Sequence, residues 1–191
     1  MHTVWLLNIA QWHQALNVLP IAAALSRRGD TEVNVAVAHA SSVAPARVLC
    51  ERLGAGRVAF HPLWPGRLGR PAPGGHPPKR LMLCAAAPRL AGADAVVAPE
   101  RTSLFLKRIG VRRPLMIHCD HGAGDRAVGY EPRIAQFDFA LLAGAKQEAR
   151  MLRERLIRPG HYRIVGYPKF EAASASRDSE VRLFAENRPT V

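Results

Sequence analysis

Cysteine is scarce in this chain, and its scarcity excludes one architecture. The 191 residues include three cysteines, Cys50, Cys84 and Cys119. They are far apart and odd in number, so they do not form the paired framework that stabilises small secreted domains. A chain of this length can bury a sizeable core without cross-links. We therefore expect reduced thiols and a cytoplasmic location.

Long apolar runs and aromatic residues are also missing. No apolar run is long enough to span a bilayer. The N-terminal residues lack a basic start and are interrupted by polar side chains, so no signal peptide is predicted. Aromatic residues make up 6% of the chain, and no basic run is interleaved with them. This composition argues against nucleic acid as a partner, because single-strand binding relies on aromatic stacking platforms.

Positive charge is in excess. The chain has 27 Lys and Arg residues against 15 Asp and Glu, a net charge of +12. One interpretation is an anionic partner, such as a membrane surface or a phosphorylated substrate. The other is a base-composition bias that enriches Ala, Arg, Pro and Gly together. Both interpretations stay open at this point.

Apolar runs alternate with helix-like segments along most of the chain. The runs predict strands, and the segments between them predict helices, among them a long amphipathic one at residues 146–157. Several of the runs are too continuous for strands with one solvated face. The pattern predicts the α/β class, with a Rossmann-like, mostly parallel sheet and helices on both faces. Strands are expected at residues 3–7, 33–37, 58–60, 95–98, 115–117, 137–142 and 162–165.

Two segments depart from this alternation. Residues 61–78 are dense in Pro and Gly and are long for a simple connection. They form either a lid or acceptor-binding loop, or a surface insertion without a role. Residues 187–191 resemble the start of a further strand. We therefore expect one domain over residues 1–170, with a hinge helix and the start of a second domain over 171–191.

The densest polar sequence follows the predicted strand 115–117. Residues 118–126 read HCDHGAGDR. Open α/β sheets bind their ligands at the carboxyl ends of parallel strands, which is where this stretch belongs. The alternative is a plain polar turn, because Gly-Ala-Gly-Asp is ordinary turn sequence.

Metal, thiol and dinucleotide chemistry are not expected here. Adjacent strand residues point to opposite faces, and His118 and His121 lack a second pair of ligands at any usual spacing. Cys119 has apolar neighbours that raise its pKa, which makes it a poor nucleophile. The glycines at 122 and 124 are too few for a dinucleotide fingerprint. We expect no metal and no cofactor.

Three segments in the C-terminal half form a recognisable series. They are a His-Gly pair with a basic residue at 121–126, a Phe-Asp strand at 137–141 and Gly-Tyr-Pro-Lys at 166–169. Their order and spacing resemble the CDP-glycerol glycerophosphotransferase family over roughly residues 118–171. The same layout is similar to UDP-N-acetylglucosamine 2-epimerases and other GT-B glycosyltransferases. Arg126 stands where that family has lysine, and arginine keeps the charge needed to bind an anion.

The resemblance implies a fold and an activity. The fold would be the N-terminal half of a GT-B protein, with most of the nucleotide-donor site in a second domain. The activity would be transfer of a glycerophosphoryl or glycosyl group from a donor such as CDP-glycerol or a nucleotide sugar. The acceptor would be an envelope polymer or a glycolipid, reached from the inner face of the cell membrane by a peripheral protein.

Transfer to a hydroxyl requires a base and positive charge for the departing phosphate. His121 is the leading candidate for the base, because histidine titrates near neutral pH. His13 is the second, since it is expected in the loop after the first strand; a loop histidine without a role is the alternative. Arg126, with Gly122, would bind phosphate, unless it is a solvated surface residue. Asp125 would orient its neighbours or cap the turn.

Two other functions remain as alternatives. One is half of an enzyme similar to UDP-sugar 2-epimerases. The other is a non-enzymatic basic module that binds anions or nucleic acid.

Overall fold

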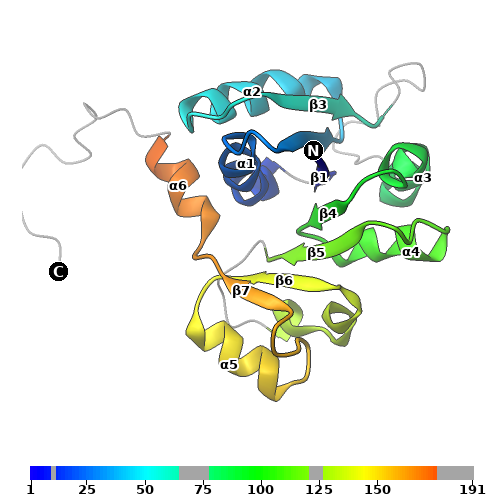
Figure 1. Cartoon of the computed structure of the whole chain (residues 1–191), viewed down its shortest axis with the longest axis vertical. Helices are drawn as coiled ribbons and strands as arrows, with labels where there is room; N and C mark the ends of the chain where they lie inside the picture. The colour runs from blue at the N-terminus through cyan, green and yellow to red at the C-terminus, as the bar shows by residue number, and fades with distance from the viewer. Residues whose placement is uncertain (10–11, 65–77, 121–126, 176–191) are drawn as a thin grey trace, which may run out of the picture.

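The computed structural model describes residues 1–9, 12–64, 78–120 and 127–175, shown as ribbon in Figure 1. Seven strands form one sheet, and every hydrogen-bonded pair in it is parallel. The predicted α/β class and parallel sheet are confirmed. The strands are β1 (His2–Asn8), β2 (Thr31–Val37), β3 (Val58–Pro62), β4 (Ala95–Ala98), β5 (Leu115–Cys119), β6 (Phe139–Leu142) and β7 (Tyr162–Ile164).

The strand order is β3-β2-β1-β4-β5-β6-β7. The chain builds outward from β1 in one direction, then returns and builds outward in the other. Leu6 is aligned with Val35 of β2 on one side and with Val97 of β4 on the other. Its side chain is fully buried, so β1 is the centre of both the sheet and the core.

One face of the sheet is covered by three helices, α1 (Trp12–Ser26), α2 (Val43–Arg52) and α6 (Pro168–Ala175). The last of these, α6, packs against α1 and α2 and buries Ala172 completely. The α6 helix therefore returns from the β7 edge to the N-terminal part of the fold (Figure 1). The core on this face includes Leu6, Val18, Leu19, Val33, Val35, Leu49, Val97 and Ala172.

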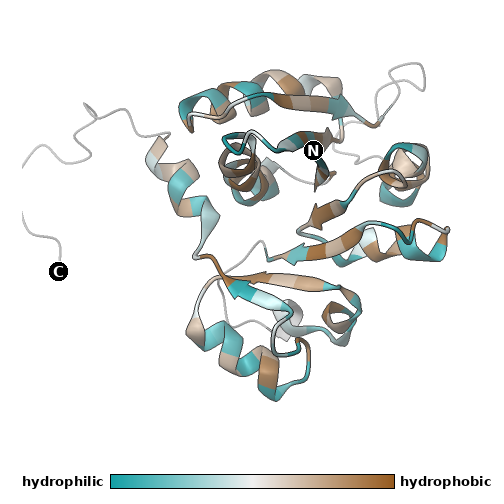
Figure 2. Ribbon diagram, in the orientation of Figure 1, coloured by the Kyte–Doolittle hydropathy of each residue, from teal (hydrophilic) through white to brown (hydrophobic). Residues whose placement is uncertain are grey.

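The other face is covered by α3 (Lys79–Leu90), α4 (Phe105–Arg108) and α5 (Ala145–Arg153). Its apolar residues form two clusters, one under α3 and α4 and one between β6 and α5. Short 3-10 helices occur at Ala40–Ser42, Arg101–Leu104, Ala127–Tyr130 and Pro132–Gln136. Figure 2 shows the central strands largely in brown, as expected for strands buried on both faces. The cluster under α3 and α4 includes Leu7, Met82, Leu83, Leu90, Val96 and Met116. The cluster between β6 and α5 includes Ile134, Leu142, Met151 and Leu156.

The first helix begins earlier than the sequence predicts. Asn17 is a good capping residue and proline is tolerated in a first helical turn, so the sequence predicts a helix from Asn17 with Pro20 in its first turn. In the structure, α1 begins at Trp12 and Pro20 lies inside it. Asn17 is not a cap: it is buried, and its Nδ2 donates to the carbonyl of His13 at 3.4 Å. Proline removes one helical hydrogen bond. Burial of Val18, Leu19 and their neighbours against the sheet offsets that loss.

The predicted helix 146–157 ends sooner, at Arg153. The amide N–H of Leu156 donates to the carbonyl of Met151 at 2.8 Å, and that of Arg155 donates to Leu152 at 3.0 Å. This is a Schellman motif, in which the apolar residue after the turn contacts the last helical turn. Leu156 thus keeps the helical apolar spacing although it lies beyond the helix. Arg155 has φ 56°, in the left-handed region that favours glycine.

The predicted loop at 61–78 begins later than expected. His61 and Pro62 belong to β3, and the N–H groups of Leu63 and Trp64 donate to carbonyls of Val37 and Ala38. Residues 65–77 lie outside the described residues, so the choice between a lid and an insertion stays a prediction. Within the described ranges, no helix is long and apolar enough to cross a membrane.

Gly56 is a position where a side chain does not fit. A Cβ added there would lie 2.5 Å from the carbonyl oxygen of Ser26, and the Gly56 N–H donates to Ser26 Oγ at 2.9 Å, which holds the two segments close together. We expect Gly56→Ala to lower the free energy of unfolding by about 1–3 kcal/mol, through overpacking at a backbone contact. Urea unfolding followed by circular dichroism measures this change. Gly29→Ala is the matched control, since nothing lies within 4 Å of its Cβ; an equal loss in both variants would contradict the prediction.

At Arg155, in contrast to Gly56, we expect a substitution to raise the stability of the fold. Glycine adopts the left-handed conformation without strain, so Arg155→Gly should raise the free energy of unfolding by about 0.5–1 kcal/mol. Arg155→Ala keeps the strain while removing the long side chain, and should not give this gain. A stability equal in Arg155→Gly and Arg155→Ala, measured in the same urea titration, would show that the conformation carries no strain.

Candidate functional site

The strand order alone predicts a ligand-binding crevice at one point of the sheet. The chain reverses its direction of growth between β1 and β4, which are hydrogen-bonded neighbours. The connections that follow these two strands leave on opposite faces of the sheet, α1 after β1 on one face and α4 after β4 on the other. Open α/β sheets bind ligands in the crevice outside the carboxyl ends of such strands.

A cleft of about 290 Å³ lies at this edge. Its residues come from the start of α1, the start of α3, the end of β4 and the turn before the Pro132–Gln136 helix. It is predominantly polar, with three cationic side chains and two carboxylates. The lining residues are Gln14, Lys79, Glu100, Arg101, Thr102, Glu131 and Arg133.

Glu100 is the carboxylate at the centre of the cleft. Its side chain is 13% exposed. One oxygen, Oε1, accepts hydrogen bonds from Lys79 Nζ at 2.6 Å and from Gln14 Nε2 at 2.8 Å. The other oxygen, Oε2, is buried without a hydrogen-bond partner. A buried carboxylate oxygen without a partner is uncommon and calls for an explanation.

The backbone also fixes Glu100 in place. Its carbonyl accepts from Ser103 Oγ at 2.6 Å and from the Ser103 N–H at 3.2 Å. These bonds close the 3-10 turn at Arg101–Leu104 directly after β4. Glu100 therefore follows a rigid strand and is clamped by the next turn, which is the arrangement that holds a functional side chain in one position.

Lys79 stands where helix electrostatics disfavour it. It is the first residue of α3, and that helix has no acidic residue in its first turn. A cation near a helix N-terminus is unfavourable by about 0.3–1 kcal/mol. The ion pair with Glu100 offsets this cost. The position of Lys79 is therefore explained by its ion pair with Glu100 in the cleft, and not by a contribution to the stability of α3.

The outer part of the cleft is formed by two arginines that share one carboxylate. Arg101 Nη2 lies 3.0 Å from Glu131 Oε1, and Arg133 Nη2 lies 3.3 Å from Glu131 Oε2. Counted with Lys79 and Glu100, three cations face two carboxylates, which leaves one positive charge in the cleft. This balance favours an anionic or polyhydroxylated ligand over a cationic one.

Further buried polar groups lie along the same edge. Asn8 ends β1, and Asn17 lies in the first turns of α1; both are buried, and their side-chain carbonyl oxygens have no partner. The same holds for Gln14 Oε1. Among the described residues, three buried amide oxygens and Glu100 Oε2 thus lack hydrogen bonds, and they belong to the end of β1, the first half of α1 and the residue pair after β4. They are acceptors for hydroxyl or amide donors of a ligand or of water.

Most of the sequence-predicted site lies outside the described residues. This applies to His121, Gly122, Asp125 and Arg126, which therefore stay predictions. The residue before them is well positioned: Asp120 Oδ2 accepts from Gln147 Nε2 at 3.0 Å, while Gln147 Oε1 accepts from the N–H of Ala143 at 2.7 Å. Gln147 of α5 thereby ties the ends of β5 and β6 together, directly before the 121–126 segment.

His13 was expected in a loop and lies instead in the first turn of α1, because the helix begins at Trp12. Its side chain is exposed, and it does not line the cleft, whereas its neighbour Gln14 does. A catalytic role for His13 stays a prediction. Sequence reasoning missed Gln14, Lys79 and Glu100. The available signal was Pro99-Glu100, a carboxylate directly after a buried strand.

His118 and Cys119 end β5 and face the interior. His118 is 1% exposed, and its ring lies 4.9 Å from that of Phe137. Burial, with a smaller contribution from Asp120, raises the pKa of the Cys119 thiol to about 12. The expected poor nucleophile is therefore confirmed. In the part of the chain that the structure describes, no group of three or more His, Cys, Asp or Glu side chains could hold a metal ion.

Comparison with known proteins gives a likeness in structure alone. No protein-family model matches the chain, and no curated protein matches its sequence. Structures of HepE from Anabaena match over 87% of this chain: in complex with UDP and glucose (TM-score 0.53, 11% identity), with UDP-glucose (0.54, 12%) and with UDP (0.51, 13%). The match covers 44% of the HepE chain. The chain thus spans less than half the length of these structures and shares the fold of one Rossmann-like half.

The three cysteines differ sharply in accessibility, and this can be measured. Cys84 is exposed, whereas Cys50 and Cys119 are buried. Burial raises the pKa of Cys50 to about 11 and that of Cys119 to about 12, so both stay protonated near neutral pH. We expect iodoacetamide at pH 7.5 to modify Cys84 alone in the folded chain, and all three thiols in 6 M guanidinium. Peptide mass mapping identifies the sites; fast modification of Cys119 in the folded chain would contradict its burial.

Proposed function

We propose that this chain is the acceptor-side half of a transferase that uses a nucleotide-activated donor. The observation that carries the proposal is the cleft at the carboxyl ends of β1 and β4, with Glu100 held by Lys79 and Gln14. The bound UDP and UDP-glucose in the structures that share this fold support a nucleotide sugar as the donor. Most of the donor site would belong to a second half of GT-B type.

The donor and acceptor can be proposed more narrowly from the sequence motifs. The series at 121–126, 137–141 and 166–169 favours the CDP-glycerol glycerophosphotransferase family, and with it glycerophosphoryl transfer from CDP-glycerol. The same family resemblance favours an envelope polymer or a glycolipid as acceptor and a peripheral position at the inner face of the membrane. The domain division at 170/171, inside α6, belongs to the same proposal.

In the proposed transfer reaction, each candidate site residue has a role. The acceptor hydroxyl oxygen forms a bond to the anomeric carbon of a nucleotide sugar, or to the phosphorus of CDP-glycerol, and the bond to the leaving nucleotide breaks. His121 takes the hydroxyl proton as general base. Arg126, together with Gly122, binds the negative charge that develops on the leaving phosphate, and Asp125 orients these groups. His13 is the second candidate for the base.

Glu100 is the residue that the structure adds to this scheme. Glu100 lines the cleft, and its Oε2, which is buried without a hydrogen-bond partner, would accept a hydrogen bond from an acceptor hydroxyl. Its Oε1 is held by Lys79 and Gln14, so the carboxylate would not need to reorganise when the acceptor binds. Glu100 would therefore position the acceptor and leave proton transfer to His121.

The test is acceptor-dependent nucleotide release by the protein translated from the complete reading frame that contains this chain. We expect release of UDP from UDP-glucose, or of CMP from CDP-glycerol, that requires an added polymer or glycolipid acceptor. His121→Ala should lower kcat by about 10²- to 10⁴-fold, the usual contribution of a general base. Release that is equal with and without acceptor, or absent with both donors, would refute the transferase.

Glu100→Gln separates binding from chemistry in the same assay. Loss of a charge-assisted hydrogen bond of about 1.5–3 kcal/mol should raise KM for the acceptor by about tenfold or more, with kcat little changed. Arg47→Gln, on the exposed side of α2, is the matched control and should leave both constants unchanged. A fall in kcat without a change in KM would remove Glu100 from acceptor binding.

A further inference from the structure

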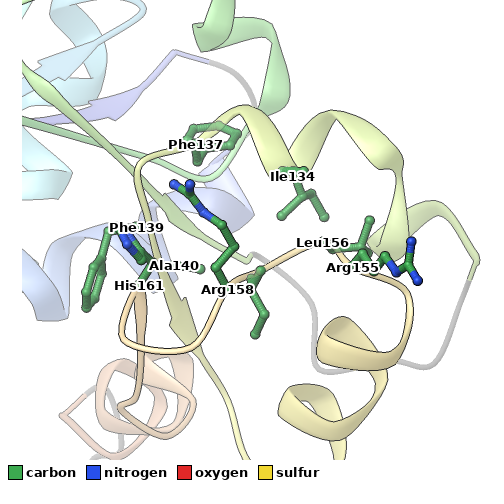
Figure 3. Close-up of a pocket in the computed structure, with 10 residues that line it drawn as sticks. Ile134, Phe137, Phe139, Ala140, Arg155, Leu156, Arg158 and His161 are labelled. Carbon is green, nitrogen blue, oxygen red and sulfur yellow. The ribbon is translucent and has the colours of Figure 1, made fainter.

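A second pocket lies at the opposite edge of the sheet. It has a volume of about 220 Å³ and is formed by the turn before β6, the start of β6 and the segment between α5 and β7. These are the amino ends of the strands, whereas the proposed transfer site lies at their carboxyl ends. Figure 3 shows the side chains that surround it.

The inner wall of this pocket is apolar. Ile134, Phe137, Leu156 and Ile157 line it, and each is less than 9% exposed. Phe139 adds a second aromatic ring. The pocket is smaller than the roughly 300–1,000 Å³ of sites for drug-sized ligands, so it suits a ligand of one ring or a short chain.

The outer part of the pocket carries positive charge. Arg158 and His161 line it, and the Arg158 side chain extends toward Phe137 in Figure 3. Arg155 also borders the pocket, but its guanidinium points away from Arg158. His161 is oriented by its backbone neighbour: Nδ1 lies 3.1 Å from the carbonyl oxygen of Asp138.

The carboxylates next to the pocket are already engaged. Asp138 lies between two lining residues, and it pairs with Lys107 at 3.0 Å and accepts from the N–H of Met116 at 2.8 Å. Glu154 pairs with Arg150 at 2.7 Å. Among the described residues, no carboxylate forms an ion pair with Arg158 within 4.0 Å. Within the described part of the chain, the exposed Arg158 guanidinium therefore borders an apolar pocket without a paired carboxylate.

We infer that this pocket binds a small organic phosphate monoester. The phosphate would pair with Arg158, whose planar fork of donors matches two phosphate oxygens, and His161 would donate a further hydrogen bond. The apolar part of the ligand would contact Phe137, Phe139 and Ile157. Both a free metabolite and the headgroup of phosphatidic acid have this phosphate monoester chemistry.

Phenyl phosphate is the probe for this site, since it joins one ring to one phosphate. We expect isothermal titration calorimetry to show binding at least fivefold tighter than that of methyl phosphate, because the ring contacts the apolar wall. Arg158→Gln should weaken phenyl phosphate binding at least tenfold. Arg47→Gln removes the same charge from α2 on the other face of the sheet, and should change the affinity less than twofold.

Two further measurements locate the ligand and identify its source. The ring-proton resonances of His161 should shift when phenyl phosphate is added to the wild-type chain and stay unshifted in Arg158→Gln. Sedimentation with phosphatidic acid vesicles that is lost in Arg158→Gln and competed by phenyl phosphate would support the site with a lipid phosphate as its source. Equal weakening by Arg158→Gln and Arg47→Gln, or no shift at His161, would overturn the proposal.

Discussion

Parallel pairing along the whole sheet is the constraint on which the rest of this structure depends. Parallel strands cannot be joined by tight turns, so every connection crosses a face of the sheet and covers it. With β1 at the centre, the crossings divide between the two faces: α1 and α2 cover one, and α3, α4 and α5 the other. The reversal between β1 and β4 then leaves their carboxyl ends uncovered. The cleft around Glu100 is a direct result of this topology.

Two charged side chains of the cleft, Glu100 and Lys79, occupy positions that are locally unfavourable for a charge. A carboxylate removed from water is unfavourable unless it is paired and hydrogen-bonded. Glu100 satisfies this requirement through Oε1 and leaves Oε2 without a partner. Lys79 in turn occupies a helix start that disfavours cations. Such conflicts between local and global preference are expected at functional sites and are rare elsewhere. Their coincidence at the ligand-binding edge of the fold supports a role in binding.

The sequence predicted the sheet well and did not point to the cleft residues around Glu100, for different physical reasons. Buried parallel strands such as β1 and β4 are short and continuously apolar, so they are visible locally. The cleft residues were missed because they are brought together by contacts such as that of Gln14 with Glu100, which is 86 residues away. His118 was grouped with a polar strand end, although the packing of Phe137 places its ring in the core. Contacts between distant segments decide these cases, and a local pattern does not record them.

The central position of β1 also has a consequence for synthesis. The N–H of Thr3 in β1 bonds to the carboxylate of Asp94, 91 residues later in the chain. At about 5–20 residues per second, a ribosome needs on the order of 5–20 seconds to produce the second neighbour of β1. During that time β2 and β3 can pair on one side, while the other edge of a strongly apolar strand has no partner. An open apolar edge is a template for pairing between chains. The nascent protein therefore passes through a stage in which its central strand has one edge open to pairing between chains.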